Sequence, residues 1–167
     1  MMYTGFQNHK LAKHFGLPYV LIRKPKPYDT TVLNYNWQIF GTQAFSIYSG
    51  DTENINKDTA KIAWLSVLRF MSNMQIIQHP MHPGTCSHTL KDSELRTILS
   101  ADSGILYSLK GAGDEIKSGD LLAKILDPFT GETRSSIFSP INGTIFFAHH
   151  KPLIHQNTVV FKIVEFK

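Results

Sequence analysis

The C-terminal part of this 167-residue chain contains the same motif twice. Residues 100–127 read SADSGILYSLKGAGDEIKSGDLLAKILD, and residues 139–165 read SPINGTIFFAHHKPLIHQNTVVFKIVE. A unit this short cannot bury its apolar face alone, whereas two copies can close on each other. We therefore expect residues 93–167 to fold as a separate two-fold β module. When one residue near Gly113 is dropped, identical residues align as Ser100/Ser139, Gly104/Gly143, Ile116/Ile154, Lys124/Lys162 and Ile125/Ile163.

Composition narrows the class of protein. The hydrophobic fraction of 42% is ordinary for a folded chain, and no apolar run approaches the roughly 18 residues of a membrane span. The single cysteine, Cys86, excludes an internal disulfide and fits a reducing compartment, so we expect a cytoplasmic protein. The net charge is +4, but the basic residues are scattered apart from Arg23, Lys24 and Lys26. A nucleic-acid surface needs a clustered basic stripe, so we expect neither nucleic acid nor a membrane as a partner.

The first 77 residues predict part of an α/β domain. Residues 8–15 predict a short helix, and Tyr19–Ile22 predict a buried parallel strand. A second helix, capped by Thr30 or Thr31, is expected to run to Gly41, and residues 44–48 predict a second strand.

The clearest helix begins after the N-cap residue Asn56. Apolar residues at helical spacing form one stripe on it, which predicts a core face. Sheets usually have about four to six strands, and two strands cover three helices poorly, so this segment is expected to be incomplete as a domain. The stripe consists of Ala60, Ala63, Trp64, Val67, Leu68, Met71 and Met74.

Residues 78–92 are polar and contain two prolines and a glycine, which predicts a linker. After about Glu94 the pattern is one of short strands and turns. Within it, Asn142-Gly143 predicts a hairpin.

The repeat resembles a known β architecture. Residues 113–122 (GDEIKSGDLL), followed by 139–143 (SPING), resemble the barrel-sandwich hybrid of biotinyl and lipoyl carrier domains. Those carriers need a modifiable lysine at a hairpin tip, and here the tip at 127–134 reads DPFTGETR, without lysine. A prosthetic arm therefore has no attachment point at this tip.

The tip itself points to a different family. Residues 125–132 (ILDPFTGE) resemble the C-terminal domain of the succinylglutamate desuccinylase/aspartoacylase family, whose members are zinc hydrolases with a carboxypeptidase-like catalytic domain. Residues 12–18 resemble the family's segment before a sheet strand, residues 40–48 (FGTQAFSIY) its strand with the catalytic glutamate, and residues 55–74 the helix that follows.

The resemblance covers nearly the whole chain in the right order and implies an α+β fold class. It implies a partial α/β carboxypeptidase-like sheet domain at residues 1–77. The linker at 78–92 then leads to an all-β barrel-sandwich hybrid domain at residues 93–167.

The chain departs from the family pattern at the active site. The family binds zinc through an early His-x-x-Glu pair and a later histidine, and the resemblance places these before this chain, which contains no His-x-x-Glu. The catalytic glutamate aligns with Tyr48, and the nearest carboxylates are Asp51 and Glu53. The resemblance therefore implies Glu53 as the candidate general base, Tyr48 as a candidate substrate-binding residue and no metal ligand in this chain.

Two other groups of residues could carry chemistry by residue type. His79, His82, Cys86 and His88 could bind a metal, but their spacing matches no closed zinc site, and a polar linker is the simpler interpretation. Cys86 also lacks a recognisable nucleophile context.

Two functions remain open. In the first, the chain is the C-terminal portion of a zinc-dependent hydrolase that cleaves the amide bond of N-acyl amino acids or similar small substrates. Zinc is expected for the intact family member and none for this chain alone, which we expect to be inactive. We also expect a homo-oligomer or association with an N-terminal half. The alternative is a non-enzymatic binding or scaffold module built on the barrel-sandwich hybrid.

Overall fold

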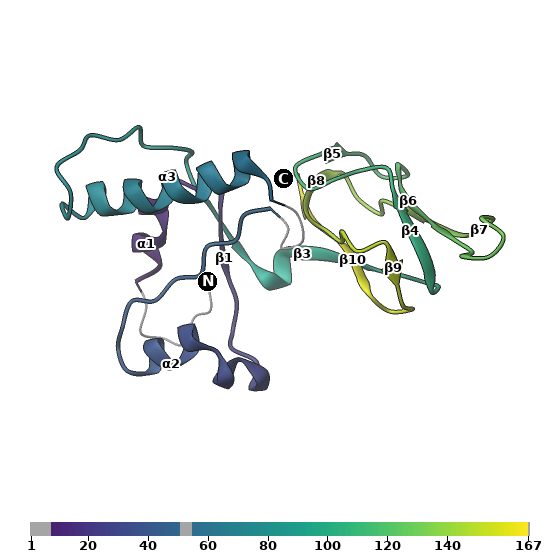
Figure 1. Cartoon of the computed structure of the whole chain (residues 1–167), viewed down its shortest axis with the longest axis horizontal. Coiled ribbons are helices and arrows are strands. Elements are labelled where there is room, and N and C mark those ends of the chain that lie inside the picture. Colours follow the sequence, from purple (N-terminus) through teal and green to yellow (C-terminus); the bar gives the residue numbers. More distant parts are fainter. Residues whose placement is uncertain (1–7, 51–54, 167) are drawn as a thin grey trace. The chain divides into compact units, whose positions relative to one another are not determined.

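The protein combines helices with small sheets (Figure 1). The computed structural model describes residues 8–50 and 55–166, and the chain divides into two compact units between Asp92 and Ser93. Within the described residues, no helix is long and apolar enough to cross a membrane.

The first unit holds the α-helices and a two-stranded sheet. Its elements are α1 (His9–Ala12), the 3-10 helix η1 (Lys13–Phe15), β1 (Tyr19–Ile22), the 3-10 helix η2 (Pro27–Thr31), α2 (Leu33–Ile39), α3 (Lys57–Asn73) and β2 (His88–Lys91). The predicted helix at residues 8–15 is confirmed as α1 and η1. The Asn8 side chain caps it by accepting a hydrogen bond from the backbone of Lys10, and it ends at Gly16, whose φ of +63° favours glycine.

The predicted parallel strand Tyr19–Ile22 is confirmed as β1, which pairs in parallel with β2. Its partner lies inside the segment that the sequence predicted to be a linker. β2 contains one apolar residue, Leu90, so it carries no strand pattern. Backbone and side-chain bonds hold it in place instead, since His88 N donates to Pro18 O at 2.8 Å and Ser87 Oγ donates to Leu17 O at 2.5 Å.

The prediction of a second strand at residues 44–48 is wrong, because this segment is irregular. The Ala44 carbonyl accepts a hydrogen bond from Gln38 Nε2 at 2.8 Å. In a sheet, a backbone N–H of a neighbouring strand would donate this bond. The predicted threonine cap of α2 is also wrong. The hydroxyls of Thr30 and Thr31 donate back to the carbonyls of Pro27 and Tyr28 within η2, and α2 begins after Val32 without a side-chain cap.

Helix α3 has the predicted N-cap, since Asn56 Oδ1 accepts from the backbone N–H groups of Asp58 and Thr59. Its core face differs from the prediction. Ser66 is fully buried, and Phe70 stacks on Phe15 with 4.4 Å between ring centroids.

The predicted apolar stripe of α3 is therefore not a core face along its length. Trp64 is 62% exposed, and Val67 and Met74 are also exposed. The helix docks on the aromatic side chains of Phe15 and Phe45 through Phe70, which the predicted stripe does not include. The prediction that these apolar residues align along α3 is confirmed. The prediction that the first unit buries this side of the helix is wrong for Trp64, Val67 and Met74.

The second unit consists of two four-stranded antiparallel sheets, ordered β3-β10-β8-β5 and β7-β6-β4-β9. A short 3-10 helix, η3 (Asp92–Glu94), leads into it. The strands are β3 (Leu95–Leu99), β4 (Gly104–Ser108), β5 (Glu115–Ile116), β6 (Leu121–Leu126), β7 (Thr133–Phe138), β8 (Gly143–Ala148), β9 (Leu153–Ile154) and β10 (Val159–Glu165). The apolar core draws on both sheets: Leu106, Ile116, Leu122, Ala123, Ile125, Ile137, Ile145, Ala148, Ile154, Val160, Phe161 and Ile163.

The sequence repeat is a structural two-fold in which the halves exchange strands. The short strand β5 of the first copy pairs with β8 of the second, and the equivalent strand β9 of the second pairs with β4 of the first (Figure 1). Equivalent hydrogen bonds recur, since Ser100 N donates to Thr158 O at 2.8 Å and Ser139 N donates to Asp120 O at 2.9 Å. Each copy therefore completes the sheet of the other.

The predicted hairpin at Asn142-Gly143 is wrong, because the flanking strands β7 and β8 belong to different sheets. Gly143 serves close packing instead. A Cβ at this position would lie 2.1 Å from Val164 O, and one at the equivalent Gly104 would lie 2.4 Å from Leu126 O. The repeated glycines therefore let each copy's first strand approach its neighbour.

We expect Gly143→Ala to destabilise the second unit by about 1–3 kcal/mol, because the added methyl group must displace a strand backbone. Urea unfolding followed by circular dichroism measures the change. Gly111→Ala is the matched control, since a Cβ there meets no atom within 4 Å. Equal stability of the two variants would show that the close approach is unimportant.

Candidate functional site

The two predicted site residues have different outcomes. Glu53, the candidate general base, lies outside the described residues. Tyr48, the candidate substrate-binding residue, lies in the irregular segment before it and is 83% exposed. Both assignments therefore stay predictions.

A polar cluster of the first unit follows the carboxyl end of β1. Arg23 forms a two-pronged ion pair with Asp29, with Nη1–Oδ2 at 2.6 Å and Nη2–Oδ1 at 2.8 Å. The backbone N–H of Lys26 also donates to Asp29 Oδ2 at 2.6 Å. Asp29 is buried, so these bonds anchor η2 beneath the end of the strand. Loops at the carboxyl ends of parallel strands are common ligand sites in α/β folds.

The electrostatics of this cluster exclude Asp29 as a general base. The Arg23 hydrogen bonds, followed by the Lys26 backbone bond, lower the pKa of Asp29 to about 2. An efficient general base has a pKa near the working pH, so this carboxylate is a structural anion.

Two exposed tyrosines lie near Arg23 of the ion pair. Tyr28 and Tyr48 lie close enough to Arg23 to add to the rise in its pKa, which is caused chiefly by the hydrogen bond to Asp29. The Lys26 ammonium lies 5.9 Å from the centroid of the Tyr28 ring, within cation–π range. The cluster can therefore offer an exposed aromatic and cationic surface to a ligand. Sequence patterns did not single out this cluster, although Asp29 stands three residues after Lys26 at the start of a Pro-led turn, where an acidic residue can accept from the N-cap backbone.

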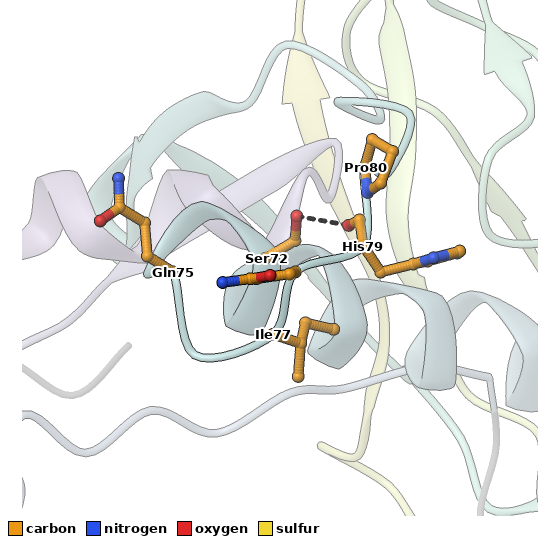
Figure 2. A pocket seen from close by; sticks show the side chains of 6 residues that line it. Ser72, Gln75, Ile77, His79 and Pro80 are labelled. Atoms are coloured by element: carbon orange, nitrogen blue, oxygen red, sulfur yellow. Dashed lines mark hydrogen bonds between the residues drawn. The ribbon is translucent and has the colours of Figure 1, made fainter.

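A depression of about 560 Å³ lies past the C-terminal end of α3 (Figure 2). Its volume falls within the range of small-molecule pockets, roughly 300–1,000 Å³. Figure 2 shows Ser72 Oγ donating to the carbonyl of His79, at 2.7 Å, while the imidazole extends away from Ser72. The serine hydroxyl therefore already donates to a backbone carbonyl. Among the residues that line the depression, His79 alone has a titratable side chain, so the lining contains no acid–base pair. The depression is lined by Ser72, Gln75, Ile77, Gln78, His79 and Pro80.

The histidines and cysteine of the 78–92 segment do not assemble a metal site. No three His, Cys, Asp or Glu side chains converge anywhere in residues 8–50 and 55–166. His82 Nδ1 accepts a hydrogen bond from Gly84 N at 3.1 Å, and the His88 ring lies beside Tyr19 on the β1–β2 sheet. The described residues therefore do not fit a zinc ion.

The fold of this chain is similar to part of several longer proteins of known structure. A scan against protein-family models finds no match, and a search of curated protein sequences finds none. Among solved structures, the succinylglutamate desuccinylase/aspartoacylase from Rhodobacter sphaeroides matches with a TM-score of 0.75 and 14% identity, over 99% of this chain and 52% of that chain.

Two further structures give the same result. The ectoine utilization protein EutE (DoeB) from Ruegeria pomeroyi, in a product-bound structure, has a TM-score of 0.74 and 18% identity, over 92% of this chain and 47% of that chain. A succinylglutamate desuccinylase from Silicibacter sp. TM1040 has a TM-score of 0.66 and 19% identity, over 94% of this chain and 48% of that chain.

These matches concern the fold. The chain spans about half the length of the structures it resembles. Both units are included, because the matches cover more than nine-tenths of this chain. The resemblance noted in residues 125–132 is therefore confirmed at the level of the fold.

We expect Asp29→Asn to lower the free energy of unfolding at neutral pH. The pKa of Asp29 falls from 3.8 to about 2 in the folded chain, so its ionised form stabilises the fold above about pH 4. That contribution is lost as the pH falls toward 2. The difference in the free energy of unfolding between wild type and Asp29→Asn should therefore narrow over this range. Urea unfolding at a series of pH values measures it.

The Arg23→Gln background is the control for this experiment. Because the Arg23 hydrogen bonds are the largest cause of the lowered pKa, the cost of Asp29→Asn should shrink there. The anchoring role of the ion pair would be contradicted if Asp29→Asn lowered the free energy of unfolding equally in the Arg23→Gln background. It would also be contradicted if the difference between wild type and Asp29→Asn did not change with pH.

Proposed function

We propose that this chain corresponds to the C-terminal portion of a zinc-dependent deacylase of the succinylglutamate desuccinylase/aspartoacylase type. The observation that carries the proposal is the match of nearly the whole chain to about half of several structures with those names. The first unit then corresponds to part of a carboxypeptidase-like α/β domain. The second corresponds to a barrel-sandwich hybrid, and its exchanged two-fold sheets support that correspondence.

The substrate class follows from the same resemblance. We propose an N-acyl amino acid or a similar small amide as the substrate of the intact protein. In such a hydrolase, bound zinc lowers the pKa of water to about 7 and polarises the amide carbonyl. The described residues of this chain do not supply its ligands, so the metal-binding residues would come from the remainder of the fold.

In this proposal, residues of this chain position the substrate and the attacking water. Tyr48 stands where the family pattern places its glutamate, and a phenol offers no carboxylate to accept the proton of an attacking water. Glu53 is the proposed base, a few residues further along the chain. Arg23, held by two hydrogen bonds to Asp29, is the proposed contact for a substrate at the carboxyl end of β1.

We expect the chain on its own to be inactive, because a carboxylate without a bound metal cannot generate hydroxide near neutral pH. Purified protein, supplied with zinc, is assayed for hydrolysis of N-acyl amino acids. Turnover that a chelator and Glu53→Gln both abolish, while Glu132→Gln at the exposed hairpin tip does not, would overturn this expectation. No turnover together with tight binding of a macromolecular partner would favour the scaffold alternative.

A second proposal concerns the exposed stripe of α3. We propose that the rest of the α/β domain covers Trp64, Val67 and Met74, because a helix normally buries its apolar face against another element.

In the chain alone, Trp64 should therefore be open to water. Trp37→Phe leaves Trp64 as the only tryptophan, and we expect red-shifted emission with efficient acrylamide quenching at low protein concentration. The reciprocal Trp64→Phe variant reports on Trp37, which is 51% exposed on α2 and serves as a reference. Emission from Trp64 that is blue-shifted and shielded in dilute solution would mean that the unit already covers its stripe.

A further inference from the structure

The surface formed by η2 and α2 carries exposed apolar side chains. Tyr28 on η2 is 65% exposed, and Leu33 and Trp37 on α2 are 61% and 51% exposed. Phe40, the C-cap residue of α2, is 84% exposed. Leu33, Trp37 and Phe40 are spaced by four and three residues, so they lie along one side of the helix. We call Tyr28, Leu33, Trp37 and Phe40 the α2 surface.

Hydrogen bonds hold this surface beside the carboxyl end of β1. The Arg23–Asp29 ion pair anchors η2 there, and Asn36 Nδ2 of α2 donates to the Thr30 carbonyl of η2 at 3.0 Å. Figure 1 shows α2 and the end of β1 on the same side of the first unit, away from α3. The α2 surface and Arg23 therefore belong to one arrangement at the end of the strand, which is a common place for ligands in α/β folds.

The charge of this arrangement is positive. Residues 8–50 contain five Lys and Arg residues but only one acidic residue, Asp29. Asp29 is buried, and Arg23 neutralises it. Lys24 and Lys26 are exposed on the loop between β1 and η2. Within residues 8–50, no exposed acid offsets their charge, so exposed apolar side chains and positive charge occur together at this end of the unit.

We propose that the α2 surface, with Arg23, Lys24 and Lys26, binds an amphiphilic anion, namely an N-acyl amino acid with a long apolar acyl chain. This inference rests on the proposed function and narrows its substrate class. The carboxylate of such a ligand suits arginine, whose guanidinium has five N–H groups, and Asp29 accepts from two of the Arg23 nitrogens. The acyl chain would cover the α2 surface and remove apolar area from water.

The length of the surface favours a long chain over a short one. A helix rises about 1.5 Å per residue, so Leu33 and Phe40 lie about 10 Å apart along α2. An acetyl or succinyl group is too short to reach both side chains. With carbon–carbon bonds of about 1.5 Å, a dodecanoyl chain is long enough. A neutral apolar ligand would leave the cationic residues unused, and a cationic one would be repelled by them.

Tryptophan fluorescence of the full chain tests the proposal. Trp64→Phe leaves Trp37, on the α2 surface, as the only tryptophan. N-dodecanoylglycine, kept below its micelle-forming concentration, should shift this emission to the blue and bind at least a hundredfold more tightly than N-acetylglycine. Dodecyltrimethylammonium has the same chain length and the opposite charge, and should bind at least tenfold more weakly than N-dodecanoylglycine.

Matched controls on α3 separate this site from adsorption to any exposed apolar side chain. Trp37→Phe leaves Trp64 as the reporter, which is 62% exposed and should respond at least tenfold more weakly to N-dodecanoylglycine. Lys24→Gln with Lys26→Gln should weaken binding at least fivefold. Lys57→Gln with Lys61→Gln, which removes two exposed lysines from α3, should leave binding unchanged.

Three results would overturn the proposal: equal binding of the dodecanoyl and acetyl compounds, equal binding of the cationic amphiphile, or an equal response of Trp64. The titration needs neither zinc nor turnover, so its outcome is independent of the hydrolysis assay. If the two acylglycines bind equally and both depend on Lys24 and Lys26, the acyl-chain inference fails while the proposed deacylase function stands.

Discussion

The exchange of short strands between the two repeats is the constraint on which the second unit depends. Ile116 of the first copy pairs with Gly143 of the second, and Ile154 of the second pairs with Gly104 of the first. Each pairing occurs where a side chain on the glycine would strike the backbone of the adjacent strand. The two sheets can enclose one apolar core because both copies meet this steric condition.

The sequence predicted this unit well and the first unit less well, for a physical reason. In the repeat, the apolar residues of both copies are buried in one shared core, so local patterns and tertiary structure agree. In the first unit, β2 contains little apolar material and is held by bonds from Ser87 and His88 to the segment before β1. Periodicity carries no information about such bonds, so the sequence predicts a linker where the structure has a strand.

The stripe of α3 and the Arg23–Asp29 pair show the same limit at the candidate site. Helical spacing identified which side chains align on α3, but not which side the rest of the fold would cover. The ion pair joins residues that each look like ordinary loop residues in the sequence, and only the folded turn brings them together. The structural matches bear on the same question, because the chain spans about half of the folds that it resembles, and its sequence alone carries no pattern for the other half.

Strand exchange also has a consequence for how the second unit reaches its native state. β4 and β9 are far apart along the chain, as are β3 and β10, which share an edge pairing. Neither repeat can form a stable intermediate by itself, because its sheet lacks an edge until the other repeat arrives. Such a high contact order makes folding slow and cooperative. During synthesis, the first repeat must therefore wait, with its apolar side chains unburied, until β10 has left the ribosome.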